Sequence, residues 1–336
     1  MSYPYYTGTP GDEPAAPVPI PAPALAARGN PRAYLADPRL VDAANVALVL
    51  GQPLLLTGEA GTGKTQLAYS LAAELGLGEP LKFETKSSSV ARDLLYTFDT
   101  LSRFHAAHNE GSPRALDYLT YSALGQAILL SADRSEHVEL LTPALLKAGT
   151  EPRRSLVLID EIDKAPRDFP NDLLNEIEHL SFRIPEVGNA EVRAGPGLRP
   201  VVVITSNSEK HLPDAFLRRC VFYHLDFPKA ARLKDIVRLR LAADGPADAG
   251  LRLNDAFLKD CVAFFERLRE DELNLRKKPG TAELLGFVAA LAAAGADTAA
   301  SLRNQKGPMR QCLGVLAKDR DDQGTARDEL ERWTPK

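Results

Sequence analysis

The stretch "PLLLTGEAGTGKTQLA", from Pro53 to Ala68, decides the fold. It contains the pattern G-x-x-x-x-G-K-[ST] between Gly58 and Thr65, after a short apolar run and before a helical pattern. A strand, a glycine-rich turn and a helix in this order form a loop whose backbone N–H groups point at phosphate oxygens. The stretch therefore predicts a nucleotide-binding α/β domain.

Each residue type in this loop has a chemical role in binding phosphate or Mg²⁺. Glycines let the backbone turn tightly, Lys64 can reach the β and γ phosphates, and Thr65 can place its hydroxyl on Mg²⁺. The predicted ligands are a nucleoside triphosphate and Mg²⁺. The nucleotide-binding residues predicted from the loop are Gly58, Glu59, Ala60, Gly61, Thr62, Gly63, Lys64, Thr65 and Gln66.

Apolar strand patterns alternate with helical patterns on both sides of the loop. "LKFETK", "SLVLID" and "PVVVITSN" read as strands, and helical segments separate them. This alternation predicts a three-layer αβα domain with a parallel sheet, whose functional loops lie at the carboxyl ends of the strands. Strand patterns stop after Pro228, which predicts a small all-helical lid domain.

The predicted organisation has three parts. Residues 1–30 are rich in proline and predict a disordered or polyproline-like arm, with a docking peptide as the alternative. Residues 31–228 form the nucleotide-binding domain, with a helical insertion at about 87–154. Residues 229–336 form the helical lid and a charged C-terminal segment.

Two adjacent acids end the strand "SLVLID". Asp160 is predicted to hold Mg²⁺, directly or through water, together with Thr65. Glu161 is predicted to polarise the attacking water as a general base. Asp163 and Lys164 are interpreted as solvated neighbours or as contacts to an adjacent subunit.

Polar and basic residues follow the next strand. The strand "VVVITSN" ends in Ser206 and Asn207, and Asn207 is preferred as the side chain that orients water or senses the γ-phosphate. Arg218 and Arg219 come just before another apolar stretch. An arginine there can stabilise phosphoryl-transfer charge across a subunit boundary.

Composition narrows the function classes. The 336 residues carry a formal net charge of -4 and no dense Lys/Arg run with interleaved aromatics, so nucleic acid is an unlikely partner. The three cysteines form no CxxC pair, which is typical of free thiols in a reducing cytoplasm. No apolar run has the length of a membrane span, and the N-terminus shows no secretory signal.

The chain resembles an AAA+ ATPase, and within that group the MoxR-type branch, which is related to the dynein-like AAA family. The resemblance covers about residues 33–290 and rests on "GEAGTGKT", "LVLIDEID", "VVVITSN" and "FLRRC", in this order. Two segments narrow it to a MoxR-like subgroup, namely "ARDLLYTFDTLSRFHAA" and "KAPRDFPNDLLNEIEHLSFRIPE".

The resemblance implies further roles. It implies Asn207 as the first sensor, and Arg219 as the finger that acts in trans, with Arg218 as the alternative. Relatives often carry an arginine as second sensor directly after the proline of "RKKPGTAELL", where this chain has Gly280. That role then passes to Lys277 or Lys278, of which Lys278 is the prediction, or is absent.

Proteins of this kind form hexameric rings and are commonly paired with von Willebrand factor A domain proteins. The resemblance therefore implies an ATP-driven remodeller of a protein client. A nucleic-acid motor or clamp loader and a nucleotide-gated regulatory or defence scaffold are the alternatives.

Overall fold

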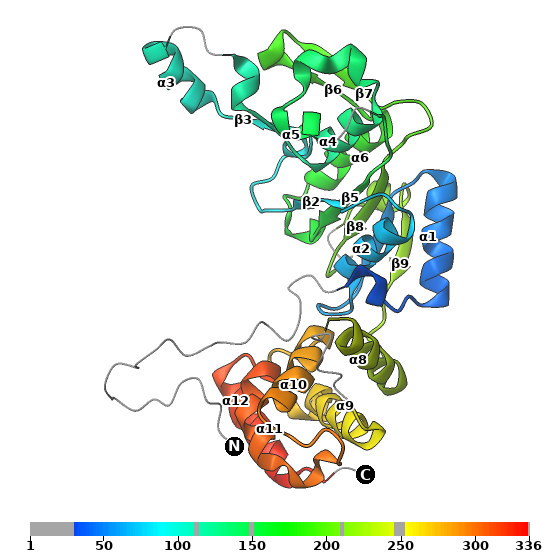
Figure 1. Cartoon of the computed structure of the whole chain (residues 1–336), viewed down its shortest axis with the longest axis vertical. Coiled ribbons are helices and arrows are strands. Elements are labelled where there is room, and N and C mark those ends of the chain that lie inside the picture. The colour runs from blue at the N-terminus through cyan, green and yellow to red at the C-terminus, as the bar shows by residue number, and fades with distance from the viewer. Residues whose placement is uncertain (1–29, 111–113, 148–150, 209–211, 245–252, 335–336) are drawn as a thin grey trace. The chain divides into compact units, whose positions relative to one another are not determined.

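The computed structural model describes residues 30–110, 114–147, 151–208, 212–244 and 253–334. Apart from Asn30, the predicted proline-rich arm over residues 1–30 lies outside these residues. The chain divides into two compact units (Figure 1). Of the described residues, the sheet unit comprises those within Ala36–Glu59 and Lys64–Asp226, and the helical unit comprises those within 30–35, Ala60–Gly63 and 227–334.

The sheet unit is built on five parallel strands in the order β2-β5-β8-β1-β9. The strands are β1 Leu54–Thr57, β2 Leu81–Glu84, β5 Leu156–Asp160, β8 Val201–Thr205 and β9 Val221–His224. Every residue of β1 and β5 is buried, because helices cover both faces of a parallel sheet. The predicted parallel α/β architecture is thereby confirmed.

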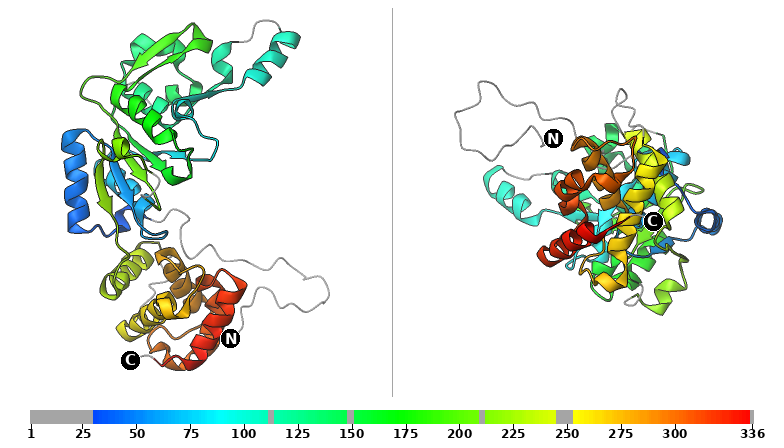
Figure 2. Two further views of the ribbon diagram at one scale, coloured as in Figure 1. Left: turned by 180° about the vertical axis from the view of Figure 1, so that it is seen from behind. Right: turned by 90° about the horizontal axis from the view of Figure 1, so that it is seen from below.

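Seven α-helices belong to the described part of the sheet unit. They are α1 Pro38–Leu50, α2 Lys64–Glu74, α3 Thr100–Glu110, α4 Ala123–Ser131, α5 Pro143–Lys147, α6 Phe169–His179 and α7 Asp214–Leu217. Helix α1 contacts β9 and β1, and it lies beside β9 in Figure 1 and in the left view of Figure 2. Helix α2 contacts β5 and β8, and Phe169 of α6 stacks on Phe83 of β2. These contacts hold the strand ends in a fixed arrangement.

The segment predicted as a helical insertion at about 87–154 is only partly helical. It contains the antiparallel pair β3 Tyr96–Phe98 and β4 Leu119–Tyr121, and α3 lies in the chain segment that connects these two strands. Helix α4 is not an added surface element, because all of its residues except Gln126 are buried and it contacts β2 and β5. Its sequence "ALGQAILLS" is apolar on almost all sides, which is typical of a buried helix.

Sequence reasoning also missed the hairpin formed by β6 Ser181–Ile184 and β7 Ala190–Arg193. Gly188 and Asn189 turn the chain between these strands, both with positive φ. Short 3-10 helices cover Pro31–Ala33, Ala91–Leu94, Ala115–Tyr118, Arg134–Leu140, Ile162–Lys164, Pro185–Val187, Asp271–Leu273 and Leu302–Asn304. None of the helices in the described part of the chain has the length and apolar character needed to cross a bilayer.

The helical unit has its own hydrophobic core. Its α-helices are α8 Ala230–Asp244, α9 Asp255–Arg269, α10 Thr281–Ala293, α11 Lys306–Leu316 and α12 Arg320–Arg332. The charged C-terminal segment belongs to this core, because Ala326 and Leu330 of α12 are fully buried and Trp333 packs edge-on against Phe264. The spacing of these apolar residues places them on one face of a helix whose other faces are charged.

Gly58 shows why the sheet unit needs glycine at the start of the phosphate loop. Its φ is 140°, and a Cβ at this position would overlap the carbonyl oxygen of Leu225. Leu225 follows β9, and its N–H donates to the carbonyl of Thr57 at 2.8 Å, so the two backbones are held side by side.

We expect Gly58→Ala to lower the free energy of unfolding by about 2–4 kcal/mol, because the strand and the loop must separate to admit a methyl group. Gly76→Ala is the matched control: Gly76 also has positive φ, 65°, but no atom lies within 4 Å of a Cβ built there. The control should cost about 1–2 kcal/mol from backbone strain alone. Urea unfolding followed by circular dichroism measures both, and equal losses would show that the approach to Leu225 is not tight.

Candidate functional site

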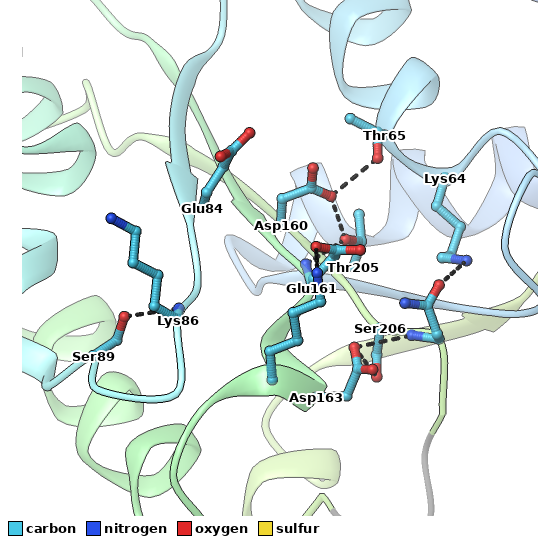
Figure 3. A network of polar contacts seen from close by, with 12 residues as sticks. Lys64, Thr65, Glu84, Lys86, Ser89, Asp160, Glu161, Asp163, Thr205 and Ser206 are labelled. Atoms are coloured by element: carbon cyan, nitrogen blue, oxygen red, sulfur yellow. Dashed lines mark hydrogen bonds and ion pairs between the residues drawn. The ribbon is translucent and has the colours of Figure 1, made fainter.

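The carboxyl ends of β1, β5 and β8 meet at one edge of the sheet and carry most of the predicted site residues (Figure 3). Lys64 and Thr65 open α2 after the loop that follows β1. Asp160 ends β5, and Asn207 follows β8 by two residues. Residues separated in sequence by more than a hundred positions are therefore neighbours in space.

The Lys64 ammonium is surrounded by oxygen atoms. Its Nζ donates to the carbonyls of Gly58 at 2.7 Å and Glu59 at 2.8 Å, and to Oδ1 of Asn207 at 3.0 Å. Burial lowers the pKa of Lys64, and the negative charges of nearby acids, led by Asp163, act in the opposite direction. A buried cation held by three neutral oxygens is suited to receive phosphate oxygens.

Both carboxylate oxygens of Asp160 have partners. Oδ1 accepts from the hydroxyl of Thr65 at 3.0 Å and from the hydroxyl of Thr205 at 2.6 Å. Oδ2 forms an ion pair with Nζ of Lys82 at 3.0 Å. The contact between Thr65 and Asp160 brings together the two residues predicted to bind Mg²⁺.

Glu161 has an unusual backbone. Its φ of 57° and ψ of 51° lie in the left-handed region, which a residue with a side chain rarely adopts. Its N–H donates to the hydroxyl of Thr205 at 2.9 Å, and its carboxylate forms an ion pair with Lys164. The carboxylate is partly exposed, so water can reach it.

Lys164 is exposed, as its interpretation as a solvated neighbour expects, whereas Asp163 is hydrogen-bonded within the site. Oδ1 of Asp163 accepts from the backbone N–H of Asn207 at 3.0 Å and from the hydroxyl of Ser206 at 3.3 Å. Lys164 pairs with Glu161 within the same chain. The Ser206 hydroxyl is thus engaged by Asp163 and by the carbonyl of Ser208, whereas the Asn207 amide contacts Lys64.

Arg218 and Arg219 lie away from Lys64. They are exposed and stand between α7 and the amino end of β9, where Arg219 donates to the carbonyl of Ala215 at 3.2 Å. Strands β9 and β1 are parallel, and Val221 pairs with Leu54, so these arginines lie beside the start of β1. The phosphate loop follows the other end of β1. Neither guanidinium forms an ion pair with any residue that the structure describes.

The remaining predicted residues lie on α2, in the phosphate loop and in the helical unit. Gln66 lies on α2, and its buried Oε1 has no hydrogen-bond partner among the described residues. Ala60–Gly63 group with the helical unit, and Gly61 and Gly63 have φ of 82° and 95°. In that unit the ammonium of Lys278 pairs with Asp271 at 2.5 Å, and the N–H of Lys277 donates to Asp322.

The residues fit a nucleotide with its metal. Three glycines in the loop have positive φ, which lets consecutive N–H groups turn inward. Within the described residues, no group of three or more His, Cys, Asp or Glu side chains forms a metal cage. Mg²⁺ in phosphate sites is held by one or two protein groups together with phosphate oxygens, and Thr65 and Asp160 can supply the protein groups.

Two residues of this network escaped sequence reasoning. Thr205 was part of the strand "VVVITSN", where threonine reads as an ordinary strand former. Lys82 was part of "LKFETK", and only the pairing of β2 with β5 brings it to Asp160. A polar residue at the end of an otherwise apolar strand was the available signal for Thr205.

Comparison with known proteins gives three findings. Residues 54–228 match the model of the ATPase family associated with various cellular activities (AAA). Among solved structures, a variant of RuvB from Thermotoga maritima matches with a TM-score of 0.45 and 16% identity, over 85% of this chain and 69% of that chain. No curated protein sequence matches the chain.

Proposed function

Because the chain belongs to the AAA family of ATPases, we propose that it hydrolyses ATP at the end of the sheet and uses this reaction to remodel a protein client. One observation carries the proposal. Lys64, Thr65, Asp160 and Asn207 form two directly hydrogen-bonded pairs, Lys64 with Asn207 and Thr65 with Asp160, at the carboxyl ends of β1, β5 and β8. This arrangement can bind a triphosphate and hold a metal ion beside it.

In this proposal each residue of the site has a separate role in ATP hydrolysis. The loop and Lys64 bind the phosphates, and Lys64 exchanges its contacts with protein oxygens for contacts with phosphate oxygens. Thr65 and Asp160 would hold Mg²⁺, which neutralises charge on the β and γ phosphates when bound. Asn207 positions the γ-phosphate or the water, and Glu161 takes the proton of the attacking water. For this step Glu161 must part from Lys164.

In this proposal a neighbouring copy of the chain supplies an arginine to each ATP site. Arg219 lies beside the start of β1, whereas its own phosphate loop follows the end of that strand. A guanidinium at this position lies away from its own phosphate loop and is available to the site of an adjacent subunit. We therefore propose a ring, most simply the hexamer that the MoxR-like motifs imply, in which Arg219 completes the next site.

Such a ring converts hydrolysis into work on a bound protein. Movement of the helical unit on hydrolysis is the simplest way to transmit the energy of the reaction to the protein client. The MoxR resemblance suggests a partner with a von Willebrand factor A domain, and a basic residue such as Lys278 as second sensor. The net charge of -4 and the lack of a dense basic run favour a protein client over a nucleic acid.

The ATPase activity of the purified protein tests this function, measured with and without Mg²⁺, at several protein concentrations and with DNA, together with the binding of a candidate partner protein. We expect Mg²⁺ to be required for ATP hydrolysis, and the activity per subunit to rise with protein concentration, because assembly completes each site. Single- or double-stranded DNA should not raise the rate, whereas a candidate von Willebrand factor A domain protein should bind only with ATP present. The Lys64→Ala variant, which we expect not to bind nucleotide, is the control. Absence of any affinity for adenine nucleotides in the wild type would overturn the proposal.

A further inference from the structure

A single buried hydroxyl connects the two acids of the site. Thr205 is the last residue of β8, is 1% exposed, and lies next to the end of β5 in the parallel pair. Its Oγ1 donates to Oδ1 of Asp160 at 2.6 Å and accepts from the N–H of Glu161 at 2.9 Å (Figure 3). One side chain thus uses its donor on one acid and an acceptor lone pair on the next.

The contact with Asp160 sets the orientation of that carboxylate. Thr205 and Thr65 donate to Oδ1, and Lys82 holds Oδ2, so rotation of the group would break several contacts. Among these partners, Thr65 is itself a predicted metal-binding residue and must adjust when a metal ion arrives. Thr205 belongs to a buried strand rather than to the phosphate loop and its helix, so it can keep its contact throughout.

The contact with Glu161 acts on the backbone. Glu161 adopts a left-handed conformation, which is unfavourable for a residue with a Cβ and needs support from the surroundings. The hydrogen bond from its N–H to Thr205 gives this support. The backbone conformation determines the direction in which the Glu161 side chain leaves the strand, and so where its carboxylate meets water.

We propose that Thr205 is a positioning residue that sets the geometry of Asp160 and Glu161 for hydrolysis. The inference rests on the proposed ATPase function of this site. Thr205 touches neither nucleotide nor water in this role and acts only through the two acids. Valine has nearly the same shape but neither donates nor accepts, so it removes both contacts while filling the same space.

The experiment compares Thr205→Val with Thr205→Ser. We expect Thr205→Val to lower kcat for ATP hydrolysis about 100-fold, because small displacements of reacting groups have effects of this size. KM for ATP should stay close to the wild-type value, because Lys64 and the loop are unchanged. Thr205→Ser restores the hydroxyl and should recover most of kcat.

A second readout does not depend on turnover. Binding of Mn²⁺ in the presence of a non-hydrolysable ATP analogue, followed by electron paramagnetic resonance, reports how Asp160 is held. The Thr205→Val variant should bind Mn²⁺ more weakly than the wild type, and Thr205→Ser should bind it as the wild type does. A hydrogen bond that only stabilised the fold would leave Mn²⁺ binding and the ratio of kcat to KM unaffected in folded protein.

Ser155→Ala is the matched control. Ser155 directly precedes β5 at the end far from the site, is 3% exposed, and its hydroxyl has no hydrogen-bond partner among the described residues. Removing this hydroxyl should leave kcat unchanged and should not lower the melting temperature, because a buried hydroxyl without a partner does not stabilise the fold. Should Thr205→Val fail to fold by circular dichroism, Thr205→Ala serves in its place.

The outcomes separate this inference from the proposed function. If the wild type hydrolyses ATP and Thr205→Val has the same kcat and Mn²⁺ binding, the positioning role is wrong and the ATPase function stands. If Thr205→Ser loses as much activity as Thr205→Val, the methyl group rather than the hydroxyl is required, and the role is also wrong. If the wild type itself neither binds nor hydrolyses ATP, the proposed function fails first.

Discussion

Replacing Glu161 with glutamine is expected to leave ATP binding intact while hydrolysis falls about 10²- to 10⁴-fold, the usual contribution of a general base. Glutamine has the same shape as glutamate but cannot take a proton from water. The backbone N–H that bonds to Thr205 remains, so the left-handed turn at residue 161 should persist. Loss of the ion pair with Lys164 should have little effect, because both side chains are exposed.

Binding and turnover are measured separately for this variant. A fluorescent ATP analogue reports affinity, and phosphate release reports hydrolysis. Sedimentation in ATP should show the variant accumulating in the assembled form, because the bound triphosphate is not cleaved. Glu178→Gln, the same change at an exposed position of α6, is the control and should behave as the wild type. Hydrolysis by Glu161→Gln at the wild-type rate would remove Glu161 from the mechanism.

Replacing Arg219 with alanine is expected to reduce hydrolysis about 10³-fold or more while each subunit still binds ATP. The reason is the position of Arg219 at the start of β9, on the other side of the sheet unit from its own phosphate loop. Within the described residues its guanidinium donates to the carbonyl of Ala215 and joins no ion pair, so its removal should barely alter folding. Initial rates and nucleotide affinity at several protein concentrations provide the measurement.

A mixing experiment tests whether the arginine acts in trans. Arg219→Ala subunits keep an intact phosphate loop, and Lys64→Ala subunits keep Arg219. Neither variant alone should hydrolyse ATP, whereas their mixture should regain part of the activity at the mixed junctions. Arg218→Ala is the matched control, because Arg218 is the exposed neighbour at the same turn. If Arg218→Ala is inactive and Arg219→Ala is active, the finger is Arg218; no recovery in the mixture would contradict action in trans.

Site residues that belong to continuous motifs could be predicted from the sequence, whereas those that depend on contacts between distant segments could not. Lys64 and Thr65 belong to a continuous motif, and the strand before it and the helix after it form where the pattern places them. The apolar runs that end in Asp160 and before Asn207 likewise form buried strands. A local pattern suffices in these cases because backbone conformation and burial follow from neighbouring residues.

Other features depended on contacts between distant segments. Asp163 looked like a surface charge, and its hydrogen bonds to Ser206 and Asn207 exist only because β5 and β8 are adjacent. Helix α4 was interpreted as part of an insertion, because its position against β2 and β5 cannot be read from its composition. The helix α12 appeared as a charged tail, since its few apolar residues are meaningful only against the core that they complete.

The sequence by itself therefore determined the phosphate loop, the parallel α/β class and the membership of the nucleotide-binding domain in its family. These features depend on short-range patterns of glycine, charge and apolar periodicity. Only the tertiary structure decided the strand order, and with it which side chains meet at the strand ends. The contacts of Thr205, Lys82 and Asp163 arise from this order, because a hydrogen bond requires atoms within about 3 Å, which sequence separation does not reveal.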